Sequence, residues 1–359
     1  MSEINYTLIA LFTDIADAIR EKMGDTATII ADDFPDMIRE RFRVISPPAT
    51  SAYLIFSSPS SFTLKVNDAT KHWDGTLEYS TNTSTWSTWD GTTTLSSATS
   101  GSDNVLYLRG TGNTVITGND YNYKWVLTGS NIACIGNIEN LMDYATVKAG
   151  QHPTMATNCY NGMFDGCTSL TQAPSLPATT LADSCYRYMF SGCTSLTQSP
   201  ALPATTLAPY CYQSMFDGCT SLTQAPALPA TTLAPYCYSQ MLQGCTSLTQ
   251  APALPATKLA FSCYMGMFVN CTALAQAPAL PATTLTPSCY QNMFRGCTSL
   301  KLSTTQTGEY TVAYRIPTTG TGTTAGSALN DMFTRTGGTF TGTPEINKTY
   351  YLSNMNTIV

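Results

Sequence analysis

Cysteine is the most reactive residue type in this sequence, and its spacing is regular. The chain has 13 cysteines, and all but Cys134 occur in pairs whose members are eight residues apart, such as Cys211 and Cys219. Paired cysteines can form disulfides, bind a metal ion or pack as small apolar thiols. A helical span of eight residues would hold the two sulfurs of a pair about 12 Å apart, which is too far for a disulfide.

Disulfides between copies and metal binding also lack support from spacing. Bonds between copies would pair cysteines arbitrarily, and Cys134 leaves the count odd. Zinc sites need closely spaced ligands or histidine partners, whereas the sequence has no CxxC and only His72 and His152. We therefore expect no metal and no cofactor, and a ladder of buried, reduced thiols. Its members are Cys167, Cys193, Cys219, Cys245, Cys271 and Cys297.

The cysteines belong to a repeat with a period of 26 residues. Copies begin at Cys159, Cys185, Cys211, Cys237, Cys263 and Cys289, and the last copy breaks off after Leu300. The near-constant residues Tyr212, Met215, Phe216 and Cys219 have i, i+3, i+4, i+7 spacing, which predicts a short helix with one buried face. The Pro-rich phrase "LTQAPALP" favours an extended stretch. We expect coils of one short strand and one short helix that stack in a solenoid, because each coil can bury its apolar residues only against its neighbours.

The phrase "MFDGCTSLTQAPALP" resembles the "AF-x-GC-x-SL … LP" phrase of BspA-like leucine-rich repeats, which occur in bacterial surface proteins and in some phage proteins. The resemblance covers 159–300 and implies a leucine-rich-repeat solenoid whose cysteine after Phe-x-Gly is a core residue. The period of 26 residues is longer than is usual in that family.

The N-terminal residues 1–45 have apolar stripes typical of two short helices. These stripes cannot bury a sufficient core by themselves, so they must dock on the next domain or on another protein. The phrase "LFTDIADAIREKMGDTATIIADDFPDMI" resembles N-terminal segments of phage and prophage virion proteins, including tail-associated ones, which implies an assembly anchor. The anchor residues would be Leu8, Leu11, Ile15, Ile19, Ile38 and Phe42.

Three further regions follow. Within 46–130, residues 52–130 alternate polar and apolar positions after the linker "SPPATS" and contain "WDGT" twice, which predicts an all-β, immunoglobulin-like sandwich over 46–130. Its residues Trp73, Trp86, Trp89 and Tyr79 could form a sugar-stacking platform or simply its core. We expect the solenoid, with an N-terminal cap, over 131–300, and a degenerate last coil and C-terminal cap over 301–359. The expected fold class is thus multidomain.

Composition excludes several classes of function. Charged residues make up 11% of the chain and the net charge is -6, which argues against nucleic acid and anionic membranes. No stretch resembles a secretion signal or a membrane span. Residues 159–300 contain three basic and three acidic side chains and no histidine, and acid–base catalysis needs titratable groups in a pocket. We expect no enzyme.

The sequence therefore favours a phage virion component, of tail or fibre type, that adheres to the host surface. It would contact other virion proteins through 1–45 and a surface glycan or protein through the solenoid, with assembly in the host cytoplasm and a homo-oligomer left open. The alternatives are a BspA-like adhesin on a bacterial cell surface and a purely structural decoration protein. Ligand contacts would lie at positions where the copies differ, namely Arg187, Tyr188, Gln213, Gln240 and Gln291.

Overall fold

The fold is built almost entirely from β-strands and turns. The computed structural model describes residues 53–118 and 123–359, which lie in one compact unit, Pro47–Val359. Within these ranges, α3 (Asn140–Lys148) is the one α-helix. The expected leucine-rich-repeat solenoid, with a short strand and a short helix in every coil, is therefore wrong. The predicted N-terminal helices and their anchor residues lie outside the described residues.

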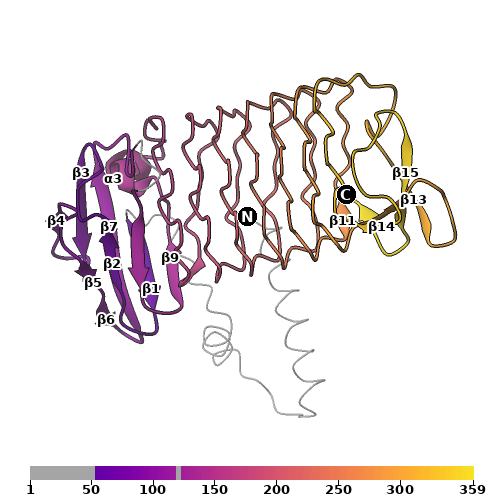
Figure 1. The fold of residues 1–359 in the computed structure, drawn as a ribbon. Helices are drawn as coiled ribbons and strands as arrows, with labels where there is room; N and C mark the ends of the chain where they lie inside the picture. The colour runs from indigo at the N-terminus through magenta and orange to yellow at the C-terminus, as the bar shows by residue number, and fades with distance from the viewer. Residues whose placement is uncertain (1–52, 119–122) are drawn as a thin grey trace, which may run out of the picture. The chain divides into compact units, whose positions relative to one another are not determined.

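Two sheets form the N-terminal part of the described chain. The larger sheet has seven strands in the order β10-β9-β1-β7-β3-β4, with β6 paired to β7, and the smaller has the order β5-β2-β8 (Figure 1). The strands of the larger sheet are β1 (Leu54–Ser58), β3 (Thr76–Ser80), β4 (Ser87–Trp89), β6 (Ala98–Ser100), β7 (Asp103–Thr111), β9 (Ile132–Ile135) and β10 (Leu170–Gln172). Those of the smaller sheet are β2 (Thr63–Val66), β5 (Leu95–Ser96) and β8 (Trp125–Thr128).

These sheets do not make the self-contained immunoglobulin-like sandwich that we expected. Strand β9 pairs antiparallel with β1 on one side and parallel with β10, which belongs to the first repeat, on the other. The aromatic core is continuous in the same way, since the ring of Phe164 lies 6.2 Å from that of Phe56 and 6.1 Å from that of Trp125. Burial of the first repeat thus depends on the sheets that precede it.

The six repeats follow as stacked coils, visible in Figure 1 as successive turns of the chain between the two groups of sheets. We call residues 159–300 the repeat stack. Alternate backbone amides bond to the next coil, as in Tyr212 N–H to Cys237 O at 3.1 Å and Phe216 N–H to Met241 O at 2.9 Å. The intervening amides bond three residues back within the coil, as in Met215 N–H to Tyr212 O at 3.2 Å. In this part of each coil, such as 210–219, every second backbone N–H therefore bonds to the neighbouring coil, and the segment cannot be α-helical.

A left-handed residue at every fourth position sets this pattern. In the third coil, Tyr210, Ser214 and Gly218 have φ of 57°, 51° and 72°. An α-helix requires consecutive right-handed residues, so each left-handed residue ends a turn after one hydrogen bond. The outcome is a chain of linked turns that presents pairs of side chains alternately inward and outward.

The inward side chains form ladders along the stack. Tyrosine rings of neighbouring coils stack nearly parallel, as do phenylalanine rings, with Tyr212–Tyr238 centroids 5.9 Å apart and Phe190–Phe216 centroids 5.7 Å apart. Elsewhere in the coil, contacts between copies are isolated parallel bridges such as Gln198 to Gln224. Regular strands in the stack are limited to β10 and β11 (Gln276–Ala277). The stack therefore depends on turn-to-turn bonds more than on regular strand pairing.

The chain after the stack forms short β-strands. A four-stranded sheet has the order β13-β15-β12-β14, and β16 pairs with β11 in the fifth coil. The strands are β12 (Lys301–Ser303), β13 (Tyr310–Arg315), β14 (Gly337–Gly338), β15 (Thr349–Ser353) and β16 (Thr357–Ile358). Phe333 stacks on Phe294 at 5.5 Å, and Phe294 N–H bonds to Met332 O at 2.9 Å. The Met332–Phe333 pair thus continues the ladder of the repeats.

All 13 cysteines are buried free thiols. One thiol per coil bonds to the coil before it, as in Cys219 Sγ–H to Phe190 O at 3.1 Å and Cys245 Sγ–H to Phe216 O at 3.2 Å. Burial raises the pKa of Cys219 to about 12. The protonated thiol therefore serves as an apolar core group with one weak donor.

We expect the native protein to resist thiol reagents. Because only the thiolate reacts, and because burial both blocks access and disfavours the thiolate, fewer than one of the 13 cysteines should react with Ellman's reagent at pH 8 within minutes. In denaturant and under nitrogen, all 13 should react. Rapid reaction of several thiols in the native protein would contradict the burial of the cysteines.

Candidate functional site

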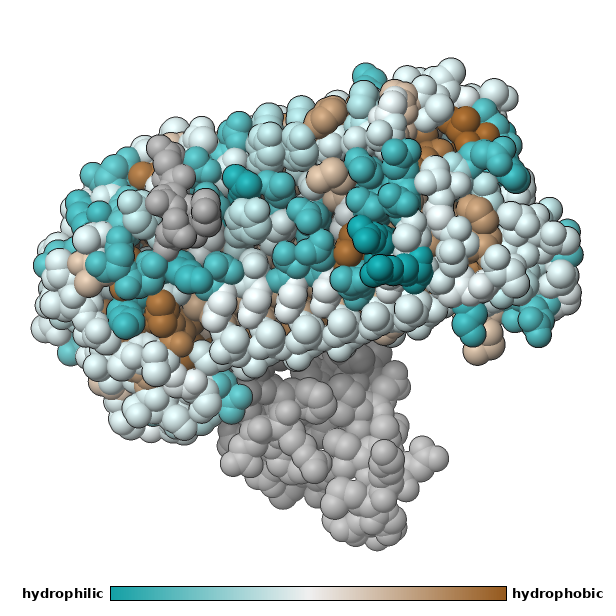
Figure 2. All heavy atoms as spheres, in the orientation of Figure 1, coloured by the Kyte–Doolittle hydropathy of each residue, from teal (hydrophilic) through white to brown (hydrophobic). Residues whose placement is uncertain are grey.

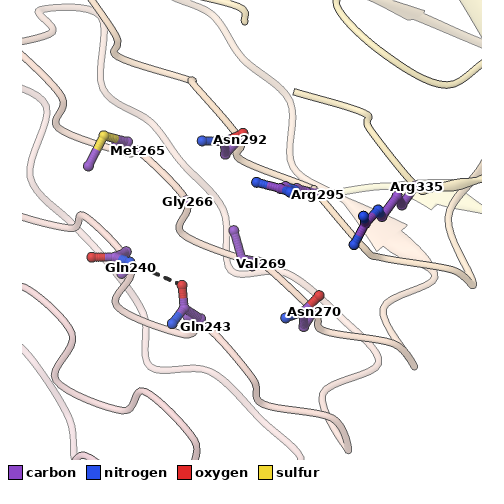
Figure 3. A pocket seen from close by; sticks show the side chains of 9 residues that line it. All are labelled: Gln240, Gln243, Met265, Gly266, Val269, Asn270, Asn292, Arg295 and Arg335. Atoms are coloured by element: carbon purple, nitrogen blue, oxygen red, sulfur yellow. Dashed lines mark hydrogen bonds between the residues drawn. The ribbon is translucent and has the colours of Figure 1, made fainter. Parts of the chain in front are cut away.

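The candidate site is a polar hollow on the outward face of the later coils. It has a volume of about 300 Å³. Figure 3 shows how side chains from three successive coils and from the segment that follows them surround it. Its lining consists of Gln240, Gln243, Met265, Gly266, Val269, Asn270, Asn292, Arg295 and Arg335.

Seven of the nine lining residues occupy the variable positions of the repeat; the other two are Asn270, which replaces a glycine, and Arg335, which follows the last copy. Two variable residues follow the Cys-Tyr pair in each coil, and one follows the Met-Phe pair. The constant residues point inward, whereas the variable side chains that line the hollow are partly or fully exposed, and variable residues of neighbouring coils lie side by side. Gly266 N–H, for example, bonds to Gln291 O of the next coil at 2.8 Å. A side chain at one variable position therefore neighbours its equivalent in the next coil.

Amide groups form one wall of the hollow. Gln240 Nε2 donates to Gln243 Oε1 at 3.1 Å (Figure 3), and Gln243 Nε2 donates to the carboxylate of Asp217, 3.2 Å from its Oδ1. Burial raises the pKa of Asp217, and the bond from Gln243 opposes that rise. This chain of bonds holds the two glutamine amides in place beside the hollow.

Asn270 stands where the other repeats have glycine. A Cβ at Gly296, the equivalent position of the next coil, would lie 2.3 Å from Asn270 Oδ1. The amide of Asn270 therefore packs over Gly296, where there is no side chain, and it lines the edge of the hollow.

The structure brings only Gln240 of the predicted contact residues into the hollow. Arg187 lies earlier in the stack, where its guanidinium is 4.9 Å from the ring centroid of Tyr188 and 5.6 Å from that of Tyr210. Gln213 is 8% exposed, so it is buried rather than on a free face. Gln291 is partly exposed and does not line the hollow.

Sequence reasoning missed most of the lining. Arg295 was visible as the variable residue after Met-Phe in the sixth copy, and Asn270 as a departure from the repeat. Arg335 gave a weaker signal, because it follows a degenerate echo of the repeat. Nothing in the sequence alone indicated that these positions would meet Gln240.

The sugar-stacking platform considered for the N-terminal sheets is not assembled. Trp73 and Trp89 are 3% and 1% exposed, with ring centroids 5.1 Å apart. Tyr79 packs against the same core. Trp86 is partly exposed, but the guanidinium of Arg109 lies 4.0 Å from its ring centroid. These aromatic rings mainly support the sheets.

A second hollow lies beside the first repeat, at the residues that follow α3. Its lining includes His152, whose Nδ1 is 2.9 Å from both carboxylate oxygens of the buried Glu139. Asn137 Oδ1 accepts the backbone N–H of Glu139 at 2.9 Å, and Tyr160 Oη–H donates to Ile138 O at 3.2 Å. The pair thus ties the segment after α3 to the residues that begin the helix.

Comparison of the chain with protein-family models, with curated proteins and with solved structures found no match. Among the described residues, no group of three or more His, Cys, Asp or Glu side chains is arranged to hold a metal ion. A membrane-spanning helix is likewise not found within 53–118 and 123–359.

Proposed function

We propose that this chain is a non-enzymatic component of a phage virion, of tail or fibre type, that recognises the surface of a host cell. The observation that carries the proposal is the polar hollow, because it forms where nearly identical coils differ from one another. The inward residues repeat since the stack requires it, whereas the core does not dictate the residues around the hollow.

The chemistry of the outward face supports carbohydrate recognition. The surface is mostly pale in Figure 2, the colour of weakly polar residues, and its most hydrophilic groups gather over the later coils. Amide, hydroxyl and guanidinium groups form hydrogen bonds with sugar hydroxyls and carboxylates. A face with few charges gives little electrostatic steering, so recognition would depend on short-range hydrogen bonds.

The assignment to a virion rests on the N-terminal resemblance. Residues 1–45 resemble virion segments and would attach the chain to its neighbours in the particle, while the repeat stack would face outward. Two parts of one chain would thus have separate partners.

Competition for host cells tests the proposal. We expect the purified full chain to reduce adsorption of the particles that carry it, and the heat-unfolded chain to have no effect. Particles grown with a chain lacking 1–45 should contain none of it, although the truncated chain should still compete.

Other outcomes point to the alternatives. If the chain is in particles but never competes, it is a decoration protein. If it is found by surface proteolysis on intact cells that release no particles, it is an adhesin.

A further inference from the structure

The hollow owes its depth to one missing side chain. Gly266 occupies the second variable position of the fifth coil, and its neighbours at the equivalent positions are Gln240 and Asn292. A Cβ at Gly266 would lie 3.2 Å from Gln240 Cγ and 3.4 Å from Val269 Cγ2. The backbone of Gly266 therefore forms the floor of the hollow, and the side chains of Gln240 and Asn292, from the coils on either side, form part of its walls.

Two unpaired cations lie on one side of this floor. Figure 3 shows the side chains of Arg295, in the sixth coil, and Arg335, in the segment after the stack, extending toward the hollow. Neither guanidinium has a hydrogen-bond or ion-pair partner among the side chains of 53–118 and 123–359. In contrast, Arg109 pairs with Glu78 at 2.8 Å, and Lys124 pairs with Asp165 at 2.9 Å.

The lining itself carries no opposing charge, although the carboxylate of Asp217 behind it accepts a bond from Gln243 Nε2 at 3.2 Å. None of its nine lining residues is Asp or Glu, although the chain as a whole carries a net charge of -6. Two like charges in one hollow repel each other, and an anion placed between them would relieve that repulsion. Arginine favours carboxylates in particular, because its planar fork can donate two parallel hydrogen bonds to them.

The remaining lining matches the other surfaces of a sugar. The side chain of Asn292 lines the hollow, and an amide can donate to or accept from a sugar hydroxyl. The amides of Gln240 and Asn270 can do the same. Met265 and Val269 supply apolar contact for the C–H groups of a sugar ring.

We propose that this hollow binds a sugar residue that carries a carboxylate. The carboxylate lies between Arg295 and Arg335, the hydroxyls bond to the amides, and the C–H face of the ring lies on Met265 and Val269. The volume is that of a small-molecule site. This inference deepens the proposed host recognition and rests on it.

Binding of defined sugars to the full chain tests the inference. Isothermal titration with sialyllactose and digalacturonic acid, against lactose and digalactose as neutral counterparts, should show at least tenfold tighter binding of one or both acidic sugars. Arg295→Gln and Arg335→Gln should each weaken that binding at least tenfold, and Arg295→Lys should recover only part of the loss. Inorganic sulfate and phosphate are titrated separately. If either binds more tightly than the acidic sugars, the site selects an anion other than a carboxylate.

Two further variants separate binding from folding. Gly266→Asn places at this position the residue type found at the equivalent position of the next coil, Asn292. The backbone there has nearly the same left-handed conformation, with φ of 57° at Asn292 and 62° at Gly266. The substitution should fill the floor and abolish binding, with little change in thermal stability. Lys301→Gln removes an exposed cation outside the lining and should leave binding unchanged.

Equal binding of acidic and neutral sugars, no binding of the acidic sugars tested, or unchanged binding by both arginine variants would overturn the inference. Each of these outcomes leaves host recognition standing if the chain still competes with particles for cells. If the wild-type chain does not compete at all, the proposed function fails instead.

Discussion

Replacing Phe216 by alanine should lower the free energy of unfolding of the repeat stack by about 3–5 kcal/mol. The side chain of Phe216 is fully buried in the third coil, and its ring stacks on that of Phe190 at 5.7 Å. Removing the ring leaves a cavity between two coils whose backbones are held in register by hydrogen bonds, so the coils cannot close it without breaking those bonds. Chemical denaturation of the wild type and the variant measures the change.

The chain itself offers a matched control. Leu242 takes the place of phenylalanine in the fourth coil and is fully buried there. Phe216→Leu removes the ring but fills most of the cavity, so it should lower the free energy of unfolding by about 1–2 kcal/mol, clearly less than alanine does. If alanine costs no more than leucine at this position, the ring ladder does not stabilise the stack in the way described.

Replacing Gly110 by alanine should prevent the described N-terminal sheets from forming. Gly110 lies in β7 and pairs with Leu77 in β3, and α3 packs on β7. A Cβ at Gly110 would lie 1.6 Å from the carbonyl oxygen of Leu141 and 2.7 Å from Asn113 Nδ2. Since the first obstacle is backbone, the helix must leave the sheet. We expect the free energy of unfolding to fall by more than about 4 kcal/mol, which would be seen as insoluble protein or as a lowered melting temperature.

A glycine with free space around it gives the comparison. At Gly308, a Cβ would meet no heavy atom within 4 Å, and the backbone there is not left-handed. Gly308→Ala should change the melting temperature by no more than a degree or two. A stable, soluble Gly110→Ala protein would contradict the close packing of α3 on β7.

The inward-facing residues of the repeats were predictable, but the local backbone was not. Tyr212, Met215, Phe216 and Cys219 face inward in the structure, and their spacing is also that of one face of a helix. The true period is four residues, and over so short a stretch it cannot be distinguished from 3.6. Glycine at 162 and 266 hints at left-handed backbone, yet tyrosine at 188 and glutamine at 240 hide the pattern. Hydrogen bonds between coils override the intrinsic preference of these residues.

The sheets show a second limit of sequence reasoning. Turn residues and alternating patterns indicated several strands between 52 and 130, and strands are found there. The pairing of β9 with β10 joins residues nearly 40 positions apart in a parallel ladder, and such a pairing leaves no local signal. The boundary expected after residue 130 therefore could not anticipate a sheet that continues into the first repeat.

The candidate site was predictable in principle and only partly in detail. Differences between copies pointed to outward positions, and Gln240 is one of them. Gln213 is also a variable residue, but it stands at the first place after Cys-Tyr rather than the second, and it is buried. Gly266 could not be recognised as the floor, because its role depends on what surrounds it.

Met265 allows the most direct test of the central claim, that the outward face of the later coils binds the host surface. It lines the hollow and is partly exposed, whereas the inward methionines of the stack are fully buried and Met355 is 82% exposed. Hydroxyl-radical oxidation can be measured residue by residue, with and without polysaccharide purified from the surface of host cells. We predict that the polysaccharide slows oxidation of Met265 several-fold and leaves Met355 unchanged. If the polysaccharide binds and Met265 is oxidised at the same rate, the binding surface lies elsewhere and the account is wrong.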